Sequence, residues 1–274
     1  MSRQLHLGGQ DYLPRDQGFT KATIQYGRQF GSRLIVTNHY TFDPAEYLTQ
    51  ELTTYTIEFI CNAGDLIFFV CFLHFAVHIP LQTRQPKIDK YAARSEQHLI
   101  NPIYSAMVEH VDDSVGRVLC ALKALNLESN TIVVFCSDNG GLTTPANSTN
   151  RFENGVTTNS PLRDEKGTLY EGGIRIPLIL RVPNLSPVNL VCDTPITTAD
   201  LFPTILGLTE TSYRDSLSID EMDITHSLTI QLSIRLPENL SSFNITTLTR
   251  PVPLFPGATN SLSIWTTVNY NSTT

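Results

Sequence analysis

The sequence predicts an α/β fold in which a mainly parallel sheet is covered by helices on both faces. Of the 274 residues, 41% are hydrophobic, which is enough to build a sizeable core in one large domain or two small ones. Short apolar runs of strand type alternate with longer segments of helical period. This alternation is typical of parallel strands that are joined by crossover helices.

The first two elements are a helix and a strand. From Leu48 to Phe59 apolar residues recur every three or four positions, and Gly64 follows as a stop signal. The next run, residues 66–77, is strongly apolar but too short to span a bilayer. We therefore expect a helix over about 47–60 and a core strand over about 66–73.

The clearest helix is expected over about 102–125. Asn101 can cap its first turn, and Pro102 suits the first helical position. A set of apolar residues at helical spacing then predicts one buried face. That set consists of Ile103, Met107, Val111, Val115, Val118, Leu122 and Leu125.

Two strands and a helix complete the regular part. The runs at 132–136 and 177–182 have the length and β-branched content of buried strands. A short helix is expected over 200–208, with Asp200 as its cap and Pro203 in its first turn. After about residue 208 the chain becomes rich in Ser, Thr, Asn and Pro, which predicts an irregular or β-rich C-terminal tail.

Charge and cysteine content exclude some classes of protein. A net charge of −7 gives no general attraction for nucleic acid. The five cysteines form no Cys-x-x-Cys pair, so neither a zinc site nor a disulfide framework is indicated. No segment is long and apolar enough to span a membrane, and the first residues show no apolar stretch of signal-peptide type. The sequence carries no signal for an oligomeric state.

Polar residues gather where the predicted strands end. Asp138 and Asn139 follow the strand at 132, His78 follows the strand at 66, and Lys166 lies in a glycine-containing loop before the strand at 177. In an open parallel sheet, ligands bind at such strand ends. An acid and an amide offer hard oxygen ligands to calcium or magnesium, and His78 and Lys166 could donate to an oxyanion. Together they would suit a charged ester.

Each of these residues also has a structural interpretation. Asp138 and Asn139 can simply bond to the backbone of a turn, His78 can be a hydrogen-bonded structural histidine, and Lys166 can be solvated. Arg175 and Glu171 we interpret as structural partners of each other.

Several stretches resemble the sulfatase family, of arylsulfatase B and N-acetylgalactosamine-6-sulfatase type. They include "HFAVHIPLQ", "TIVVFCSDNGG", "LRDEKGTLYEGGIRIP" and "TPITTADLFPTILGL", and the match runs in the family's order over roughly residues 6–208. The pair "SDNGG" and "EKGTLYEGG" is specific. The resemblance implies an alkaline-phosphatase-like α/β/α sandwich, with a partial catalytic domain at 1–208 and a divergent C-terminal region at 209–274.

The resemblance also implies roles for the residues at the strand ends. Asp138 and Asn139 would be ligands of one calcium ion, and His78 and Lys166 would hold the sulfate or assist the leaving group. His6 would match the histidine of the family's Gly-Lys-Trp-His-Leu-Gly block. The expected substrate is a sulfated small molecule or a sulfated sugar.

Other positions depart from the family. The lysine of that block falls on Gln4 and its tryptophan on Leu5. Upstream of this block the family also carries an Asp-Asp pair for calcium and a Cys-x-Pro-Ser-Arg motif whose cysteine becomes the formylglycine nucleophile, and neither precedes the block here. We therefore expect an N-terminally incomplete sulfatase that lacks the first strands of its sheet, binds calcium poorly and has impaired activity.

Two other functions stay open at this point. One is a catalytically inactive sulfatase-like binding protein, and the other is a phosphate-ester hydrolase of the alkaline-phosphatase superfamily. The loop "EKGTLYEGG" favours the sulfatase. Full-length relatives are expected in the lysosome or outside the cell, whereas the compartment of this chain is not indicated by its sequence.

Overall fold

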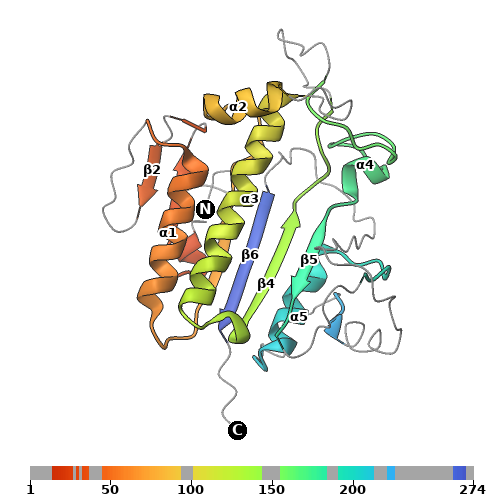
Figure 1. The fold of residues 1–274 in the computed structure, drawn as a ribbon. Helices are drawn as coiled ribbons and strands as arrows, with labels where there is room; N and C mark the ends of the chain where they lie inside the picture. Colours follow the sequence, from red (N-terminus) through yellow and green to blue (C-terminus); the bar gives the residue numbers. More distant parts are fainter. Residues whose placement is uncertain are drawn as a thin grey trace, which may run out of the picture.

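A four-stranded sheet with helices against it organises the part of the chain that the structure describes (Figure 1). The structure is a computed structural model that describes residues 14–26, 29–30, 33–36, 45–93, 101–143, 155–183, 191–212, 221–225 and 262–269. The helices are α1 (Leu48–Ala63), α2 (Gln85–Ala92), α3 (Pro102–Ala124), α4 (Glu171–Ile174) and α5 (Leu201–Leu208). The strands are β1 (Thr23–Tyr26), β2 (Arg33–Val36), β3 (Phe69–Leu73), β4 (Thr131–Ser137), β5 (Leu178–Arg181) and β6 (Leu262–Asn269). The predicted α/β class is confirmed.

Strand direction differs from the prediction. The order in the main sheet is β3-β6-β4-β5, and each of these neighbouring pairs is antiparallel. Strands β3 and β4 run parallel to each other, as expected, but β6 lies between them. The reason is that the C-terminal region, expected to be a separate tail, supplies an internal strand of the sheet. Strands β1 and β2 form a separate antiparallel pair.

Strand β4 has apolar side chains on both faces, which explains its continuous hydrophobic run. Ile132, Val134 and Cys136 belong to a core cluster that includes Leu201 of α5. Residues 133 and 135, on the opposite face, pack against the cluster formed by α1, α3 and β3. Because successive side chains of a strand point to opposite faces, helices can cover β4 on both sides.

Helices α1 and α3 form as predicted and pack side by side (Figure 1). The Asn101 side chain accepts hydrogen bonds from the amides of Ile103 (3.0 Å) and Tyr104 (3.2 Å), which confirms it as the cap of α3. Helix α1 ends at Gly64, whose φ of 57° lies in the left-handed region that glycine tolerates.

Two local predictions are corrected by the structure. Strand β3 begins at Phe69 and not at residue 66, since Leu66 and Ile67 lie before it and are 71% and 64% exposed. Asp200 occupies the N-cap position of α5, as predicted, but its side chain makes no capping hydrogen bond to that helix. Its carboxylate accepts hydrogen bonds from the amides of Thr197 (2.7 Å) and Met222 (2.9 Å), so it closes the preceding 3-10 turn and holds a distant segment.

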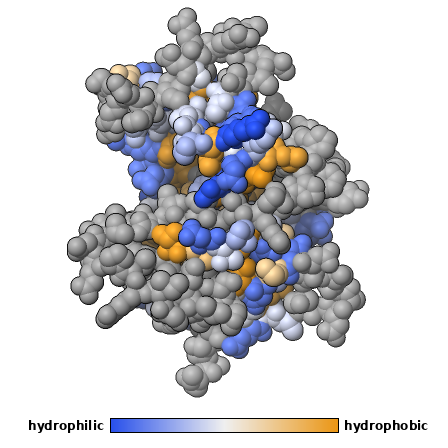
Figure 2. Space-filling model, turned by 90° about the vertical axis from the view of Figure 1, so that its right-hand side faces the viewer, coloured by the Kyte–Doolittle hydropathy of each residue, from blue (hydrophilic) through white to orange (hydrophobic). Residues whose placement is uncertain are grey.

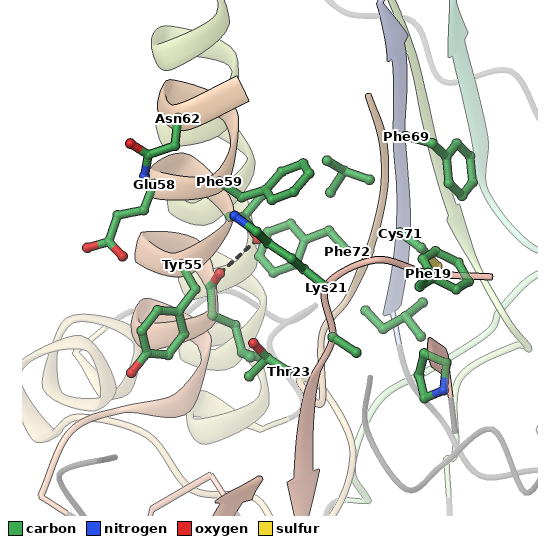
Figure 3. A pocket seen from close by; sticks show the side chains of 16 residues that line it. Phe19, Lys21, Thr23, Tyr55, Glu58, Phe59, Asn62, Phe69, Cys71 and Phe72 are labelled. Atoms are coloured by element: carbon green, nitrogen blue, oxygen red, sulfur yellow. Dashed lines mark hydrogen bonds between the residues drawn. The ribbon is translucent and has the colours of Figure 1, made fainter. Parts of the chain in front are cut away.

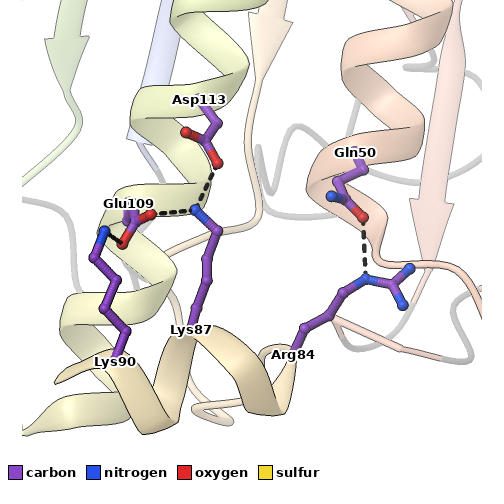
Figure 4. Close-up of polar contacts among 6 residues, drawn as sticks. All are labelled: Gln50, Arg84, Lys87, Lys90, Glu109 and Asp113. Carbon is purple, nitrogen blue, oxygen red and sulfur yellow. Dashed lines mark hydrogen bonds and ion pairs between the residues drawn. The ribbon is translucent and has the colours of Figure 1, made fainter. Parts of the chain in front are cut away.

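None of the residues of helix α2 is buried. Ion pairs, and not an apolar face, therefore attach this helix to α3. Lys87 contacts Glu109 and Asp113 of α3, each at 2.6 Å, and Lys90 contacts Glu109 at 2.9 Å (Figure 4). The hydrogen bonds from these lysines lower the pKa of Glu109 to about 2. A helix with no buried stripe gives no hydrophobic period, which explains why the sequence did not predict it.

The face that carries β5 and α4 shows separate hydrophobic areas among hydrophilic ones (Figure 2). Scattered apolar residues of this kind are normal on a protein surface. Within the described ranges, no helix combines the length and the apolarity that a membrane span requires.

A buried histidine makes the stability of the fold sensitive to acid. His74 is fully buried, its Nε2 lies 2.8 Å from the Ser114 hydroxyl, and burial lowers its pKa from 6.5 to about 3. As the pH falls below 6.5, the unfolded chain gains this proton before the folded chain does. The stability that His74 contributes above pH 6.5 is therefore lost progressively as the pH falls toward 3.

We expect the free energy of unfolding to fall by about 1.4 kcal/mol per pH unit from this residue alone between about pH 6 and pH 4. Urea unfolding at several pH values checks this, with the His74→Gln variant as control. The variant should lose less stability per pH unit than the unmodified chain over the same range. Equal slopes for the two proteins would show that His74 is not the group responsible.

Candidate functional site

Asp138 and Asn139 lie directly after β4, as predicted. Asp138 is exposed and Asn139 is half-buried. The Ser137 hydroxyl donates to the Asn139 carbonyl at 2.8 Å, and Asn139 Nδ2 donates to the Gly140 carbonyl at 3.0 Å. These local bonds form a turn that leaves the Asp138 carboxylate facing solvent at the carboxyl end of the strand.

The backbone of this turn packs tightly against the loop that carries Lys166. The Gly140 amide donates to the Gly173 carbonyl at 2.8 Å, and the Lys166 amide donates to the Gly141 carbonyl at 3.2 Å. A Cβ atom at Gly140 would lie 1.8 Å from the carbonyl oxygen of Gly172. The glycines of both loops are therefore needed for the close approach of two backbones.

The side chains of Asn159 and Glu165 also join these two loops, and neither role is indicated by the sequence. Asn159 bonds both backbone groups of Gly141: its Oδ1 accepts from the amide (3.2 Å), and its Nδ2 donates to the carbonyl (2.9 Å). The Glu165 carboxylate accepts from the amide and hydroxyl of Thr143. An Asn or Glu within a loop gives no local signal of such a role, because its partner lies about twenty residues away.

His78 follows β3 and is half-buried. Its Nδ1 bonds the Ile79 carbonyl, and because a carbonyl oxygen only accepts, Nδ1 carries the hydrogen. Burial lowers the pKa of His78, and the nearby charge of Lys166 lowers it further, although the bond to Ile79 acts in the opposite direction. At neutral pH the imidazole is therefore uncharged, with Nε2 available as an acceptor.

Lys166 is also half-buried, and burial lowers its pKa from 10.5 to about 8. The negative charge of Asp138 opposes this shift. Lys166 therefore stays mostly protonated at pH 7, and its ammonium group is less fully hydrated than that of a surface lysine.

Electrostatic coupling brings three of the predicted residues together. The charge of Lys166 lowers the pKa of His78, and the charge of Asp138 raises the pKa of Lys166, so Lys166 is electrostatically linked to both other residues. The side chains come from three loops that are far apart in the sequence. Together they offer one carboxylate, one ammonium group and one neutral imidazole.

The coupling itself can be measured. Replacing Lys166 by Met should raise the pKa of His78, because a positive charge that disfavours the imidazolium is removed. Replacing Asp138 by Asn should lower the pKa of Lys166 below about 8, because its stabilising partner is lost. NMR titration of labelled histidine and lysine side chains reports both values.

A matched control is Lys123→Met, in the last turn of α3, which should leave the pKa of His78 unchanged. A His78 pKa that does not respond to Lys166→Met would show that the two side chains do not share a site.

The other predicted residues have different positions. His6, Gln4 and Leu5 lie outside the described residues. Arg175 Nη1 lies 3.0 Å from Glu171 Oε2, one helical turn away, which confirms these two residues as structural partners.

The oxygen ligands after β4 were compared with what calcium requires. Calcium takes six to eight oxygen ligands, as a rule with several carboxylates. Asp138 and Asn139 offer one carboxylate and one amide, and the described ranges contain no group of three or more His, Cys, Asp or Glu residues that could hold a metal ion. Asp138 and Asn139 therefore do not make a calcium site by themselves.

Comparison with known proteins shows similarity over most of the chain. A family model described as Sulfatase matches residues 5–211. The chain is 35% identical to a sulfatase of Formosa agariphila, over 65% of this chain and 32% of that protein. It is 32% identical to arylsulfatase J of Mus musculus (72% and 31% covered) and 31% identical to steryl-sulfatase of Homo sapiens (65% and 29%). The chain thus spans about a third of the length of these relatives.

Solved structures show the same fold. The chain resembles Ps i-CgsB, whose structure in complex with k-i-k-neocarrahexaose gives a TM-score of 0.70 at 23% identity. That comparison covers 80% of this chain and 52% of the other. At this identity the likeness concerns the fold, which is the alkaline-phosphatase-like α/β fold.

Proposed function

Since the chain belongs to the sulfatase family, we propose that it forms part of a hydrolase of sulfate esters and that the cluster of Asp138, His78 and Lys166 is where the sulfate group binds. The observation that carries this proposal is the close packing of the loop of Lys166 against the turn after Asp138, through the bond from the Lys166 amide to the Gly141 carbonyl (3.2 Å). The effect of the Lys166 charge on the pKa of His78 agrees with it. A cluster of this kind at the strand ends of an α/β sheet is a typical position for a ligand site.

The chemistry of each residue suits that role. The Lys166 ammonium group, partly removed from water, is a point charge for a sulfate oxygen. His78 is neutral before substrate binds, and a bound anion would raise its pKa and favour a proton on Nε2. Protonated His78 could then donate that proton to the oxygen of the leaving alcohol, as a general acid.

Calcium is proposed as a cofactor, with only two of its ligands among the described residues. Asp138 and Asn139 would contribute two oxygen ligands, and the remaining ligands would have to come from outside the described residues. When bound, such an ion would neutralise charge on the sulfate oxygens.

The substrate is proposed to be a sulfated small molecule or a sulfated sugar, handled as in arylsulfatases of the arylsulfatase B and N-acetylgalactosamine-6-sulfatase type. The longer protein is proposed to act in the lysosome or outside the cell. A phosphate ester is the less favoured substrate, because "EKGTLYEGG" matches the sulfatases.

A second candidate function is a catalytically inactive, sulfate-binding member of the family. It is favoured by one observation: the 274 residues contain no Cys-x-Pro-Ser-Arg motif to supply the nucleophile. This function needs the anion site but no covalent chemistry.

Reading the genomic DNA upstream of the codon for Met1 distinguishes the two functions. We expect an in-frame Cys-x-Pro-Ser-Arg sequence there, and the extended protein should hydrolyse a chromogenic aryl sulfate. The Lys166→Ala variant of that extended protein should lose roughly a hundredfold or more of kcat/KM, since one cation is removed from the transition state. No motif upstream, together with sulfate binding by residues 1–274, would favour the inactive binding protein.

A further inference from the structure

A cavity of about 290 Å³ lies between α1, β3 and the segment that precedes β1 (Figure 3). It is separate from the cluster described above, since neither Asp138, His78 nor Lys166 lines it. Its volume is close to the lower end, about 300 Å³, of pockets that hold small molecules. Nothing in the proposed sulfatase chemistry uses this cavity.

Five of the sixteen residues that line the cavity are aromatic, and four of these are phenylalanines. Phe59 comes from α1, Phe69 and Phe72 come from β3, and Phe19 comes from the N-terminal segment. The rings of Phe19 and Phe69 are 6.0 Å apart, within the range of aromatic pairs. Cys71 also lines the cavity, and burial raises the pKa of its thiol to about 12, so it stays uncharged. The interior is therefore suited to a flat apolar group.

One cation is directed into this aromatic cavity. Lys21 Nζ lies 5.6 Å from the centre of the Phe59 ring, and Figure 3 shows its side chain reaching across toward α1. Glu58, the acid among the lining residues, points away from Lys21 on the outer side of the helix (Figure 3). None of the ion pairs found among the described residues includes Lys21. Its charge is therefore available to a ligand.

We propose that this cavity binds a small aromatic anion, with one or two rings against the phenylalanines and a single carboxylate or sulfonate group at Lys21. Lys21 is exposed to solvent, so its ammonium group can make a charge-assisted contact with an anionic group of a ligand whose rings lie in the cavity. It is the one cation among the described residues that line the cavity. A monoanion with an aromatic body matches both the walls and the single positive charge.

Titration of residues 1–274 with 1-anilinonaphthalene-8-sulfonate tests the proposal, because this probe has an aromatic body and one sulfonate and fluoresces when bound. We expect one site per chain by calorimetry. Lys21→Glu should weaken binding at least about tenfold, whereas Lys21→Arg should retain it. Lys123→Glu makes the same change in net charge on α3 and should leave the affinity unchanged.

Two further measurements locate the site and test the charge. Phe59→Ala, which removes one ring from the cavity wall, should weaken binding of the probe, whereas Val108→Ala, at an exposed apolar position of α3 outside the cavity, should leave it unchanged. The uncharged analogue N-phenyl-1-naphthylamine should bind more weakly than the sulfonate. Equal weakening by Lys21→Glu and Lys123→Glu, unchanged binding in Lys21→Glu, or unchanged binding in Phe59→Ala would each overturn the proposal. Because all these readouts are independent of Lys166, they succeed or fail separately from the sulfatase function.

Discussion

Residues 1–274 alone are expected to hydrolyse a chromogenic aryl sulfate at least roughly a thousandfold more slowly than a sulfatase that carries the Cys-x-Pro-Ser-Arg motif. Covalent catalysis requires its nucleophile, and none of the five cysteines of this chain lies in that motif. His78 and Lys166 can stabilise charge only after a nucleophile has begun to attack the sulfur atom. These two residues therefore cannot restore the reaction by themselves.

The measurement is turnover of the aryl sulfate by purified residues 1–274 in the presence of calcium. The Asp138→Ala variant is the control for activity that depends on the candidate site. Turnover close to that of a motif-bearing sulfatase, and lost in Asp138→Ala, would contradict the prediction and point to a different nucleophile. Turnover that is unchanged in the variant would indicate a contaminating enzyme.

Replacing Gly140 by Ala is expected to lower the free energy of unfolding by about 3 kcal/mol and to separate the two loops of the candidate site. The new Cβ would lie 1.8 Å from the Gly172 carbonyl oxygen, which is backbone and cannot rotate away. To relieve this contact, the loop after β4 would have to move away from the loop that holds Lys166. The bond from the Gly140 amide to the Gly173 carbonyl would then be lost.

Gly116→Ala is the matched control for this substitution. Gly116 lies in the middle of α3, and a Cβ there meets nothing within 4 Å. Alanine at this position should stabilise the protein by about 0.5–1 kcal/mol, because it favours the helix. Urea unfolding measures both variants, and NMR titration of Lys166 in Gly140→Ala should show its pKa rising from about 8 toward 10.5. A stability loss below about 1 kcal/mol, with the Lys166 pKa unchanged, would show that the two loops do not depend on this close contact.

The elements that were predicted well are those whose signals are local. Helix α3 has a cap at Asn101, a proline in its first turn and a regular apolar face, and it forms where these signals place it. Strand β4 is short, continuous and rich in β-branched residues, and it is buried between two layers. Helix α2 could not be found in this way, because its stability comes from ion pairs with α3 and not from a periodic apolar face.

By itself, the sequence determined the α/β class, the main helices and strands, and the residue types at the strand ends. Only the tertiary structure decided that β6 lies between β3 and β4, because the backbone bonds of a strand do not specify its partner. The same holds for the candidate site, where the pKa values of His78 and Lys166 depend on burial and on charges from other loops. It holds also for Lys21, which meets the Phe59 ring only because the N-terminal segment packs against α1. Contacts between distant segments are formed by folding, and no local pattern of residues encodes them.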